Sequence, residues 1–328
     1  MPLNEFDIIN QYFNRAIAPE SAVIKGIGDD GAIVSPTVGK QLVMSVDTMV
    51  AGCHFPENTS PFNIGSRALC TSLSDLAAMG AKPLWFTLGL TLPESYNEWL
   101  EQFSAGLFSI ADRYHCELIG GDITRGPLTI TIQVHGEVFP DTILRRDGAV
   151  AGDQVFVTGP LGDGAAALAA LQNEISISLE DHHYLSKRFY SPEPQIIAGQ
   201  TIAALAHSAI DISDGLLADA AHIAKASGVA IVLHIDRIPT AKALKNVDRE
   251  RRLRWLLTGG DDYQLLFTVA AKRVGELADL ISQKHIHAYC IGEVRADNSG
   301  QYHVRCFDQG QRYHIGKCHE SGYQHFTT

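Results

Sequence analysis

The sequence lacks the features that identify membrane and exported proteins. No stretch approaches the ~18 consecutive apolar residues of a membrane helix, and residues 1–10 hold no basic cluster ahead of an apolar run. A signal peptide requires both of those parts. The six cysteines form no Cys-x-x-Cys pair. We therefore expect reduced thiols in a cytoplasmic protein that does not bind membranes.

A surplus of positive charge is also missing. The formal net charge is −11, whereas a protein that binds nucleic acid along a broad surface needs a basic face. We expect no nucleic-acid partner. The negative charge does not exclude a small phosphate ligand, because bound metal ions can reverse the local sign.

Familiar nucleotide and zinc motifs are absent as well. The chain has no Gly-x-x-x-x-Gly-Lys-Ser/Thr loop and no protein-kinase signature set. The histidines and cysteines of residues 285–319 match no common zinc spacing, although a metal site there stays conceivable. The glycine-rich segment Gly159–Gly164 precedes a predicted helix, so its amides could hold an anion. A tight strand-to-helix turn is the interpretation we prefer for it.

The size and composition favour a globular protein with two domains. The chain has 328 residues, of which 45% are hydrophobic and 19% charged. A turn-rich segment from Asp147 to Asp153 interrupts the pattern. We predict domains at residues 1–147 and 148–328.

Hydrophobic periodicity predicts a mixed α/β (α+β) fold in which helices pack on mixed sheets. Helices are expected over residues 5–17, 63–79, 96–114, 165–171 and 216–227. Strands are expected over residues 41–47, 84–92, 117–120, 128–139, 154–158, 209–212, 230–235 and 263–269. No short repeat or low-complexity segment interrupts them.

Aspartates beside glycine or serine are the most informative feature that is present. They occur in Gly26–Asp30, Ser45–Asp47, Leu73–Asp75, Gly120–Asp122 and Asp211–Gly215. A single such pair is usually a turn, but several fall at the expected ends of strands, where ligands often bind. Clustered carboxylates repel one another unless a cation lies between them. Oxygen-only ligands suit magnesium, which often also holds substrate phosphates.

The order of these motifs resembles the thiamine-monophosphate kinase family of the aminoimidazole-ribonucleotide-synthetase-like superfamily. The segments Leu73–Ala81 and Gly322–Phe326 are the parts most specific to that family, and Gly259–Tyr263 completes the series. The resemblance spans nearly the whole chain. It implies two α/β domains and a homodimer formed through the N-terminal domains. It also implies ATP and several Mg²⁺ ions in a cleft that the C-terminal domain completes, for phosphorylation of thiamine monophosphate to thiamine diphosphate.

The resemblance also assigns roles to individual residues, and it assigns none of them to catalysis by a protein side chain. The implied metal ligands are Asp30, Ser45, Val46, Asp47, Asp75, Asp122, Asp211 and Asp214. The implied ATP contacts are Gly121, Asp122, Arg146 and Ser213. The implied substrate contacts are His54, Asp261 and Tyr323. The acceptor phosphate is already anionic, so direct in-line transfer needs no general base.

The sequence departs from the family pattern at several of these positions. Val46 stands where threonine is common, so it would ligate only through its backbone carbonyl. Ser72 replaces asparagine, and Ile123 replaces a frequent threonine. Asp261 replaces glutamate and is one methylene shorter, which makes it the least secure of the substrate contacts.

Two other kinds of function fit parts of the pattern. Sibling enzymes of the superfamily include aminoimidazole-ribonucleotide synthetase, selenophosphate synthetase and a hydrogenase-maturation protein. The second of these needs a reactive cysteine near the N-terminal glycine motif, and no cysteine precedes Cys53. The third needs a C-terminal cysteine, and Cys318 lies ten residues before the end. A non-catalytic acidic metal-binding protein is the alternative from another class.

Overall fold

The computed structural model describes residues 4–18, 21–297 and 299–313. The chain divides into two compact units. The first contains Met1–Leu76 and Ala81–Pro140, and the second contains Ala77–Gly80 and Asp141–Thr328. We describe each unit by itself. The boundary at residues 147/148 stays a prediction.

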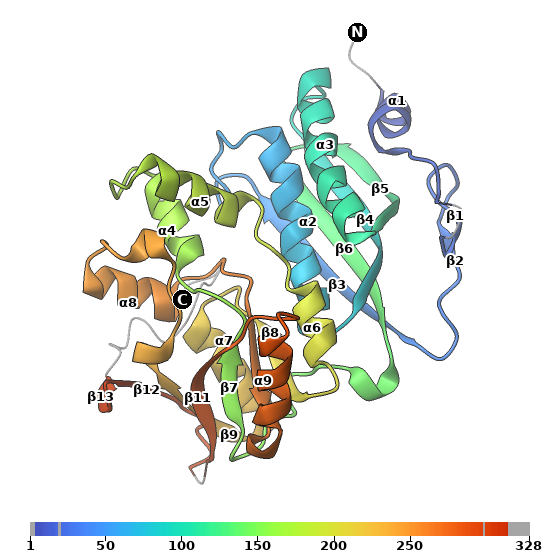
Figure 1. The fold of residues 1–328 in the computed structure, drawn as a ribbon. Coiled ribbons are helices and arrows are strands. Elements are labelled where there is room, and N and C mark those ends of the chain that lie inside the picture. The colour runs from blue at the N-terminus through green and yellow to red at the C-terminus, as the bar shows by residue number, and fades with distance from the viewer. Residues whose placement is uncertain (1–3, 19–20, 298, 314–328) are drawn as a thin grey trace. The chain divides into compact units, whose positions relative to one another are not determined.

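The first unit is built on a four-stranded sheet in the order β3-β6-β4-β5. Its strands are β3 (Gln41–Val50), β4 (Lys82–Leu92), β5 (Glu117–Arg125) and β6 (Thr129–Val138). Two long helices, α2 (Pro61–Ala78) and α3 (Asn97–Tyr114), cover one face of it (Figure 1). Their apolar stripes are buried, as the helical period predicted. β4 pairs parallel with β5 and antiparallel with β6, so the sheet is mixed.

The predicted helix over residues 5–17 is wrong beyond Phe13. The chain forms α1 (Glu5–Ile8), then a π-helical turn η1 (Ile9–Phe13), and Asn14 is already extended. The next residue, Arg15, pairs with Asp112 of α3 at 2.8 Å and lies over the Phe108 ring. These tertiary contacts accompany the end of the helical pattern.

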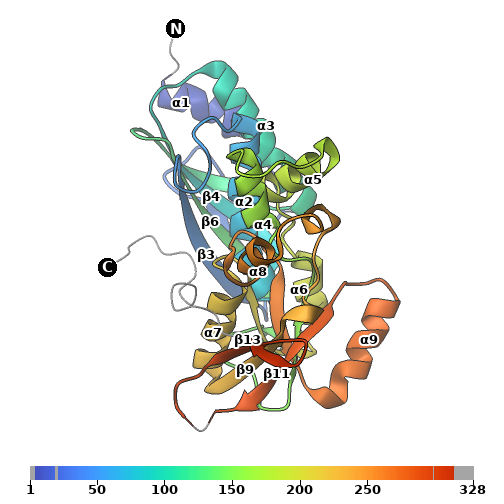
Figure 2. The same ribbon diagram turned by 90° about the vertical axis from the view of Figure 1, so that its left-hand side faces the viewer.

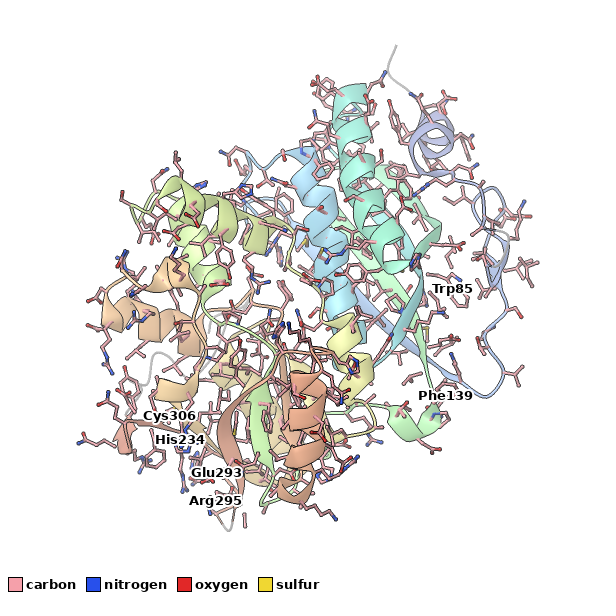
Figure 3. The ribbon with its side chains drawn as sticks, viewed as in Figure 1. Trp85, Phe139, His234, Glu293, Arg295 and Cys306 are labelled. Atoms are coloured by element: carbon pink, nitrogen blue, oxygen red, sulfur yellow. The ribbon has the colours of Figure 1, made fainter. Side chains whose placement is uncertain are left out.

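A two-stranded sheet, β1 (Val23–Lys25) with β2 (Ile33–Val34), follows this N-terminal segment. Val23 packs with Trp85 of β4 and Ile119 of β5 in a small apolar cluster. Figure 3 labels Trp85 of this cluster. The loop between β1 and β2 carries the first aspartate motif. Packing of β1 against Trp85 therefore places that loop beside the main sheet.

Strand β5 is longer than the predicted 117–120. Asp122 lies inside the strand, opposite Gly89 of β4, rather than beyond its end. Gly121 is needed at this point, because its φ is +154° and a Cβ there would lie 1.9 Å from the Leu88 carbonyl oxygen. Asp47 likewise lies within β3 rather than at its end.

The second unit is built on a seven-stranded sheet in the order β13-β12-β9-β11-β7-β10-β8. Its strands are β7 (Gln154–Val157), β8 (Ala206–Asp211), β9 (Val229–His234), β10 (Leu265–Val269), β11 (Tyr289–Ala296), β12 (Val304–Asp308) and β13 (Gln311–Tyr313). Helices α7 (Leu216–Ser227) and α9 (Val274–Ser282) lie on opposite sides of these strands (Figure 2). All five β10 residues are buried, which fits a central strand.

Further helices of this unit are α4 (Asp163–Leu171), α5 (Leu179–Tyr190), α6 (Ile196–Ile202) and α8 (Arg249–Thr258). Short 3₁₀ turns occupy Pro140–Thr142, Ile235–Arg237, Lys242–Leu244 and Ala271–Arg273. The sequence predicted α4 and α7 but not α5, α6, α8 or α9. None of the helices in the described ranges is long and apolar enough to cross a bilayer.

Candidate functional site

In the first unit, β3 and α2 bring together three of the predicted metal ligands. The Ser45 hydroxyl donates a hydrogen bond to the Asp75 carboxylate. Asp47 lies two residues farther along β3, so its side chain leaves the strand on the same face as Ser45. Asp75 is half-buried within the otherwise apolar helix α2. A strand and a helix thus hold two carboxylates and a hydroxyl at one place.

The electrostatics of this group fit a cation. Burial and then the nearby Asp75 carboxylate raise the pKa of Asp47, a hydrogen bond with Ser72 lowers it, and the net pKa is about 6. Two neighbouring carboxylates repel each other, and a positive ion between them relieves that repulsion. The donors are all oxygens, which is the set that Mg²⁺ prefers. The residues present therefore fit magnesium.

Val46, the remaining predicted ligand on β3, directs its side chain away from this group. It is 58% exposed, on the face opposite Ser45 and Asp47. Only its backbone could face a metal. The valine in place of threonine consequently removes no side-chain ligand from this face.

A second group of predicted residues lines one cavity of the first unit. Asp30, Gly121 and Asp122 all border a cavity of about 720 Å³. The β1–β2 loop supplies Asp30 and strand β5 supplies the other two. Both aspartates are exposed. The fold thus brings together two motifs that are about ninety residues apart in the sequence.

His54 follows β3 and is fixed by the backbone. Its Nδ1 accepts a hydrogen bond from the Val50 amide at 3.0 Å. A neutral imidazole that accepts at Nδ1 carries its proton on Nε2. Nε2–H is a donor, so the geometry favours a contact to an anion over a role as a general base.

In the second unit, the end of β8 and the start of α7 carry a separate acidic group. Asp211 ends β8, as predicted, and it is buried; Asp214 and Asp219 follow it. Asp219 accepts hydrogen bonds from the amides of Asp214 and Gly215, at 3.2 and 3.1 Å. Burial and then the nearby Asp211 and Asp214 raise the pKa of Asp219, the two amide hydrogen bonds lower it, and the net pKa is about 8.

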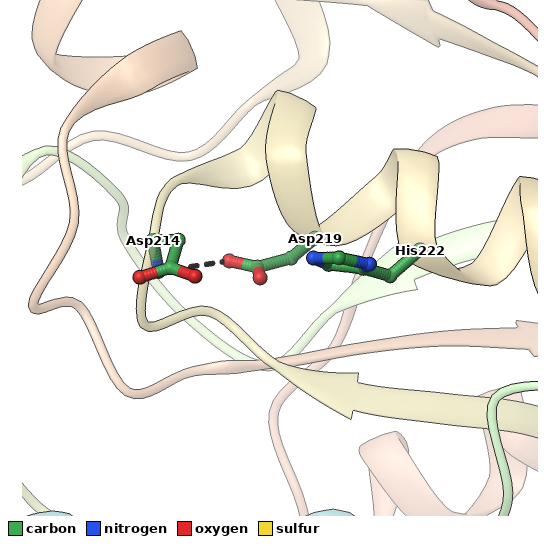
Figure 4. A group of neighbouring side chains, drawn as sticks. All are labelled: Asp214, Asp219 and His222. Atoms are coloured by element: carbon green, nitrogen blue, oxygen red, sulfur yellow. Dashed lines mark hydrogen bonds between the residues drawn. The ribbon is translucent and has the colours of Figure 1, made fainter. Parts of the chain in front are cut away.

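Side chains of Asp214, Asp219 and His222 approach one another closely enough to bind one ion (Figure 4). In the described part of the chain, no other group of three or more such side chains is as close. The sequence predicted Asp214 as a metal ligand but did not predict Asp219 or His222. Their spacing of three residues on one helix was the signal that could have indicated them.

Other predicted residues lie outside these groups. The side chain of Arg146 is exposed, and its carbonyl accepts a hydrogen bond from Ser227 at 2.9 Å. The carbonyl of Ser213 accepts one from the Asp261 amide at 2.9 Å. Tyr323 is outside the described residues, and so are Cys318 and the other tail residues from 314 onward.

The glycine-rich turn before α4 is filled by a side chain of the protein itself. The Asp262 carboxylate accepts hydrogen bonds from Gly162 at 2.6 Å and Gly164 at 3.1 Å. Asp262 is 1% exposed. Burial and then the nearby Asp163 raise its pKa, the hydrogen bonds from Gly162 and Gly164 and the charge of Arg188 lower it, and the net pKa is about 7. The amides that could have held a phosphate instead hold Asp262. This agrees with the turn that the sequence favoured.

Comparison with known proteins gives the family. The model of the AIR synthase related protein matches with its N-terminal domain over residues 28–138 and with its C-terminal domain over residues 150–305. The chain is 44% identical to the thiamine-monophosphate kinase of Salmonella typhimurium over 335 aligned positions, covering 100% of both chains.

Solved structures agree with this comparison. The crystal structure of thiamine-monophosphate kinase from Stenotrophomonas maltophilia K279a has a TM-score of 0.82 at 40% identity, covering 90% of this chain and 93% of that one. A structure described as AaThiL complexed with AMPPCP and TMP has a TM-score of 0.75 at 32% identity, covering 92% of each chain. The mixed α/β fold in two domains is therefore confirmed.

Proposed function

This chain belongs to the thiamine-monophosphate kinase family, and we infer from that premise that it transfers the terminal phosphate of ATP to thiamine monophosphate. The product is thiamine diphosphate, so the enzyme acts in thiamine diphosphate biosynthesis. One observation carries this inference: full-length identity of 44% to a named kinase of this activity. The relative that was solved with AMPPCP and TMP supports the same two substrates.

We propose that the carboxylates of the first unit bind magnesium. Asp47 and Asp75, assisted by Ser45 and the Val46 carbonyl, form one group, and the cavity residues Asp30 and Asp122 form another. In the second unit, Asp211 and Asp214 would bind a further ion. Bound Mg²⁺ would screen the repulsion between the two phosphates and orient them. The raised pKa of Asp47 supports this proposal, because it reports carboxylates that a cation would stabilise.

For the nucleotide, we propose contacts from Gly121, Asp122, Arg146 and Ser213. For thiamine monophosphate, we propose contacts from His54, Asp261 and Tyr323. The Nε2–H donor of His54 suits an anionic phosphate. We retain residues 1–147 as the domain that binds ATP and magnesium, and residues 148–328 as the domain that supplies Asp261.

The transfer itself needs no protein nucleophile. The acceptor phosphate is anionic near neutral pH, so the residues have to orient and neutralise rather than remove a proton. The aspartates would be committed to metal, and His54 already uses Nδ1 as an acceptor. We therefore propose direct in-line transfer with no phosphoenzyme.

We propose that the protein forms a homodimer through the first unit. The outer face of β3 exposes Leu42, Met44, Val46 and Val50 by 40, 60, 58 and 37%. An apolar row along an edge strand is usually covered by another chain. Two copies of β3 would bury it. We propose a cytoplasmic location as well, since none of the five cysteines that the structure describes is in a disulfide.

The test of the reaction is direct. Purified protein is incubated with ATP, Mg²⁺ and thiamine monophosphate, and the products are separated by chromatography. We expect ADP and thiamine diphosphate in equal amounts. ATP hydrolysis that does not depend on thiamine monophosphate would contradict the proposal.

A further inference from the structure

The proposed substrate contact Asp261 has an unusual backbone conformation. Its φ is +67°, and that of Tyr263 is +50°. Residues other than glycine seldom adopt positive φ, and such strain persists only where the surrounding structure holds it. On one side, the amides of Asp261 and Tyr263 donate to the carbonyls of Ser213 and Ile212, at 2.9 and 2.8 Å. The end of β8 therefore fixes one side of this segment.

The turn before α4 holds the other side. The Asp262 carboxylate binds the amides of Gly162 and Gly164. The approach is close enough that a Cβ on Gly164 would lie 2.6 Å from the Asp261 carbonyl oxygen. Asp261 thus lies between two backbone segments, and its own carboxylate accepts a hydrogen bond from the Tyr263 hydroxyl at 2.8 Å.

Helix α5 supplies a third contact to this segment, through the side chain of Arg188. Arg188 donates from Nη2 to the Asp262 carbonyl at 3.1 Å and from Nε to the Asp163 carboxylate at 3.3 Å. Asp163 is fully buried and also accepts a hydrogen bond from the Tyr184 hydroxyl at 2.5 Å. The guanidinium is therefore held by a buried anion, and it binds the carbonyl of Asp262, the residue after Asp261.

We propose that Arg188 is a positioning residue, which orients Asp261 toward thiamine monophosphate through the Asp262 carbonyl while Asp163 and Tyr184 hold the guanidinium in place. This rests on the proposed function, because Asp261 is its substrate contact. The guanidinium presents several N–H donors in one plane, so a single side chain can bind the Asp262 carbonyl and the Asp163 carboxylate at once. Arg188 itself touches neither substrate nor nucleotide in this account.

The test compares Arg188→Met with a matched control, Arg252→Met. Arg252 also donates to backbone carbonyls of the second unit, those of Leu244 and Lys245. For Arg188→Met we expect the KM for thiamine monophosphate to rise about tenfold, the size expected for losing a charge-assisted hydrogen bond. The KM for ATP should stay within about twofold, as should both KM values of the control. Arg188→Lys should restore only part of the loss.

A double-mutant cycle separates positioning from general destabilisation. If Arg188 acts through Asp261, Arg188→Met adds little to the KM of Asp261→Asn. Additive effects, or equal rises in the KM for ATP and for thiamine monophosphate, would overturn the proposal. Should Arg188→Met not fold, Tyr184→Phe decides: a rise confined to the KM for thiamine monophosphate supports the proposal, and unchanged kinetics contradict it.

The outcomes also separate this inference from the proposed function. A wild-type protein that makes no thiamine diphosphate contradicts the function. If the wild type is active but the Asp261→Asn variant binds thiamine monophosphate normally, Asp261 is not a substrate contact. The positioning proposal then fails as well. An active enzyme with an impaired Asp261→Asn but a normal Arg188→Met contradicts the positioning proposal alone.

Discussion

The hydroxyl of Ser45 on β3 donates a hydrogen bond to the carboxylate of Asp75 on α2, thirty residues later in the chain. The contact joins the sheet of the first unit to the helix that covers it. It places Asp75 beside Asp47, whose pKa Asp75 raises. The metal site that we propose for this unit is built on that contact.

Asp75→Asn should nearly abolish activity while leaving the fold intact. The amide keeps the shape of the side chain and removes one negative charge from a proposed metal site. Losing a shared ligand should lower kcat/KM on the order of 10- to 100-fold or more. Steady-state kinetics at saturating Mg²⁺ measure the effect, and circular dichroism checks the fold.

Asp112→Asn is the matched control for that substitution. Asp112 lies in the same unit, and its ion pair with Arg15 is exposed. Exposed ion pairs contribute little to the free energy of unfolding, about 0–1 kcal/mol. The control should keep normal turnover. Near-normal turnover in Asp75→Asn as well would show that Asp75 is not a ligand.

Magnesium affinity should rise as the pH increases through about 6. In the metal-free protein Asp47 has its pKa raised to about 6, so below that value it is protonated and has to lose its proton to ligate. The same shift means that Asp47 stabilises the metal-free fold at acid pH, and that this contribution is lost as the pH rises through about 6. Titration calorimetry of Mg²⁺ in buffers of different ionisation enthalpy measures the proton release.

Asp47→Asn should reduce that proton release. The amide does not titrate, so the calorimetric enthalpy near pH 5.5 should depend on the buffer less than in the wild type. The remaining dependence would come from Asp219 of the second unit, which its pKa of about 8 keeps protonated at that pH. Proton release that is unchanged in Asp47→Asn would assign it to another group and contradict the prediction.

Magnesium and nucleotide should stabilise the protein together. A ligand that binds only the native state raises stability by RT ln(1 + [L]/Kd), about 2.7 kcal/mol at one hundred times Kd. With both ligands sharing one site, the rise in melting temperature should exceed the sum of the separate rises. Thermal denaturation with Mg²⁺, AMPPCP and both together gives the answer. A merely additive effect would mean separate sites.

His54→Asn should weaken thiamine monophosphate binding more than it lowers kcat. Nδ1 of His54 accepts from the Val50 amide, so Nε2 carries the proton, and we expect Nε2–H to donate to substrate equally in the ground and transition states. Initial rates over a range of thiamine monophosphate concentrations separate KM from kcat. A fall in kcat of several hundredfold at unchanged KM would instead point to a catalytic proton transfer.

Direct transfer makes a further prediction about His54 and the aspartates. Incubation with ATP labelled in its terminal phosphate, without thiamine monophosphate, should leave no label on the protein. A stoichiometric covalent label that passes into thiamine diphosphate would overturn direct transfer. The kinase assignment would survive that result.

The sequence predicted the fold where strong local patterns exist. The apolar stripes of α2 and α3 and the run of β10 needed no tertiary information. The predicted helix over 5–17 failed beyond Phe13, where Asn14 is extended and Arg15 contacts the distant Asp112, a tertiary contact that no local pattern shows. Helix α8 was missed because Arg249–Arg254 holds four arginines, so its apolar face is narrow.

The candidate site was predictable as a set of motifs but not as an arrangement. Asp30 and Asp122 border one cavity, and Asp47 and Asp75 meet elsewhere in the same unit. No local pattern shows which carboxylates become neighbours. The Asp262 carboxylate that fills the Gly162–Gly164 turn was unpredictable for the same reason, since about one hundred residues separate the partners.

Product analysis tests the central claim most directly. The wild-type protein is incubated with ATP and Mg²⁺, with and without thiamine monophosphate, and thiamine diphosphate is quantified by chromatography, with Asp75→Asn as the inactive control. The account predicts one thiamine diphosphate per ADP, formed only when thiamine monophosphate and Mg²⁺ are both present. The absence of thiamine diphosphate from a folded wild-type protein that binds both substrates would contradict it.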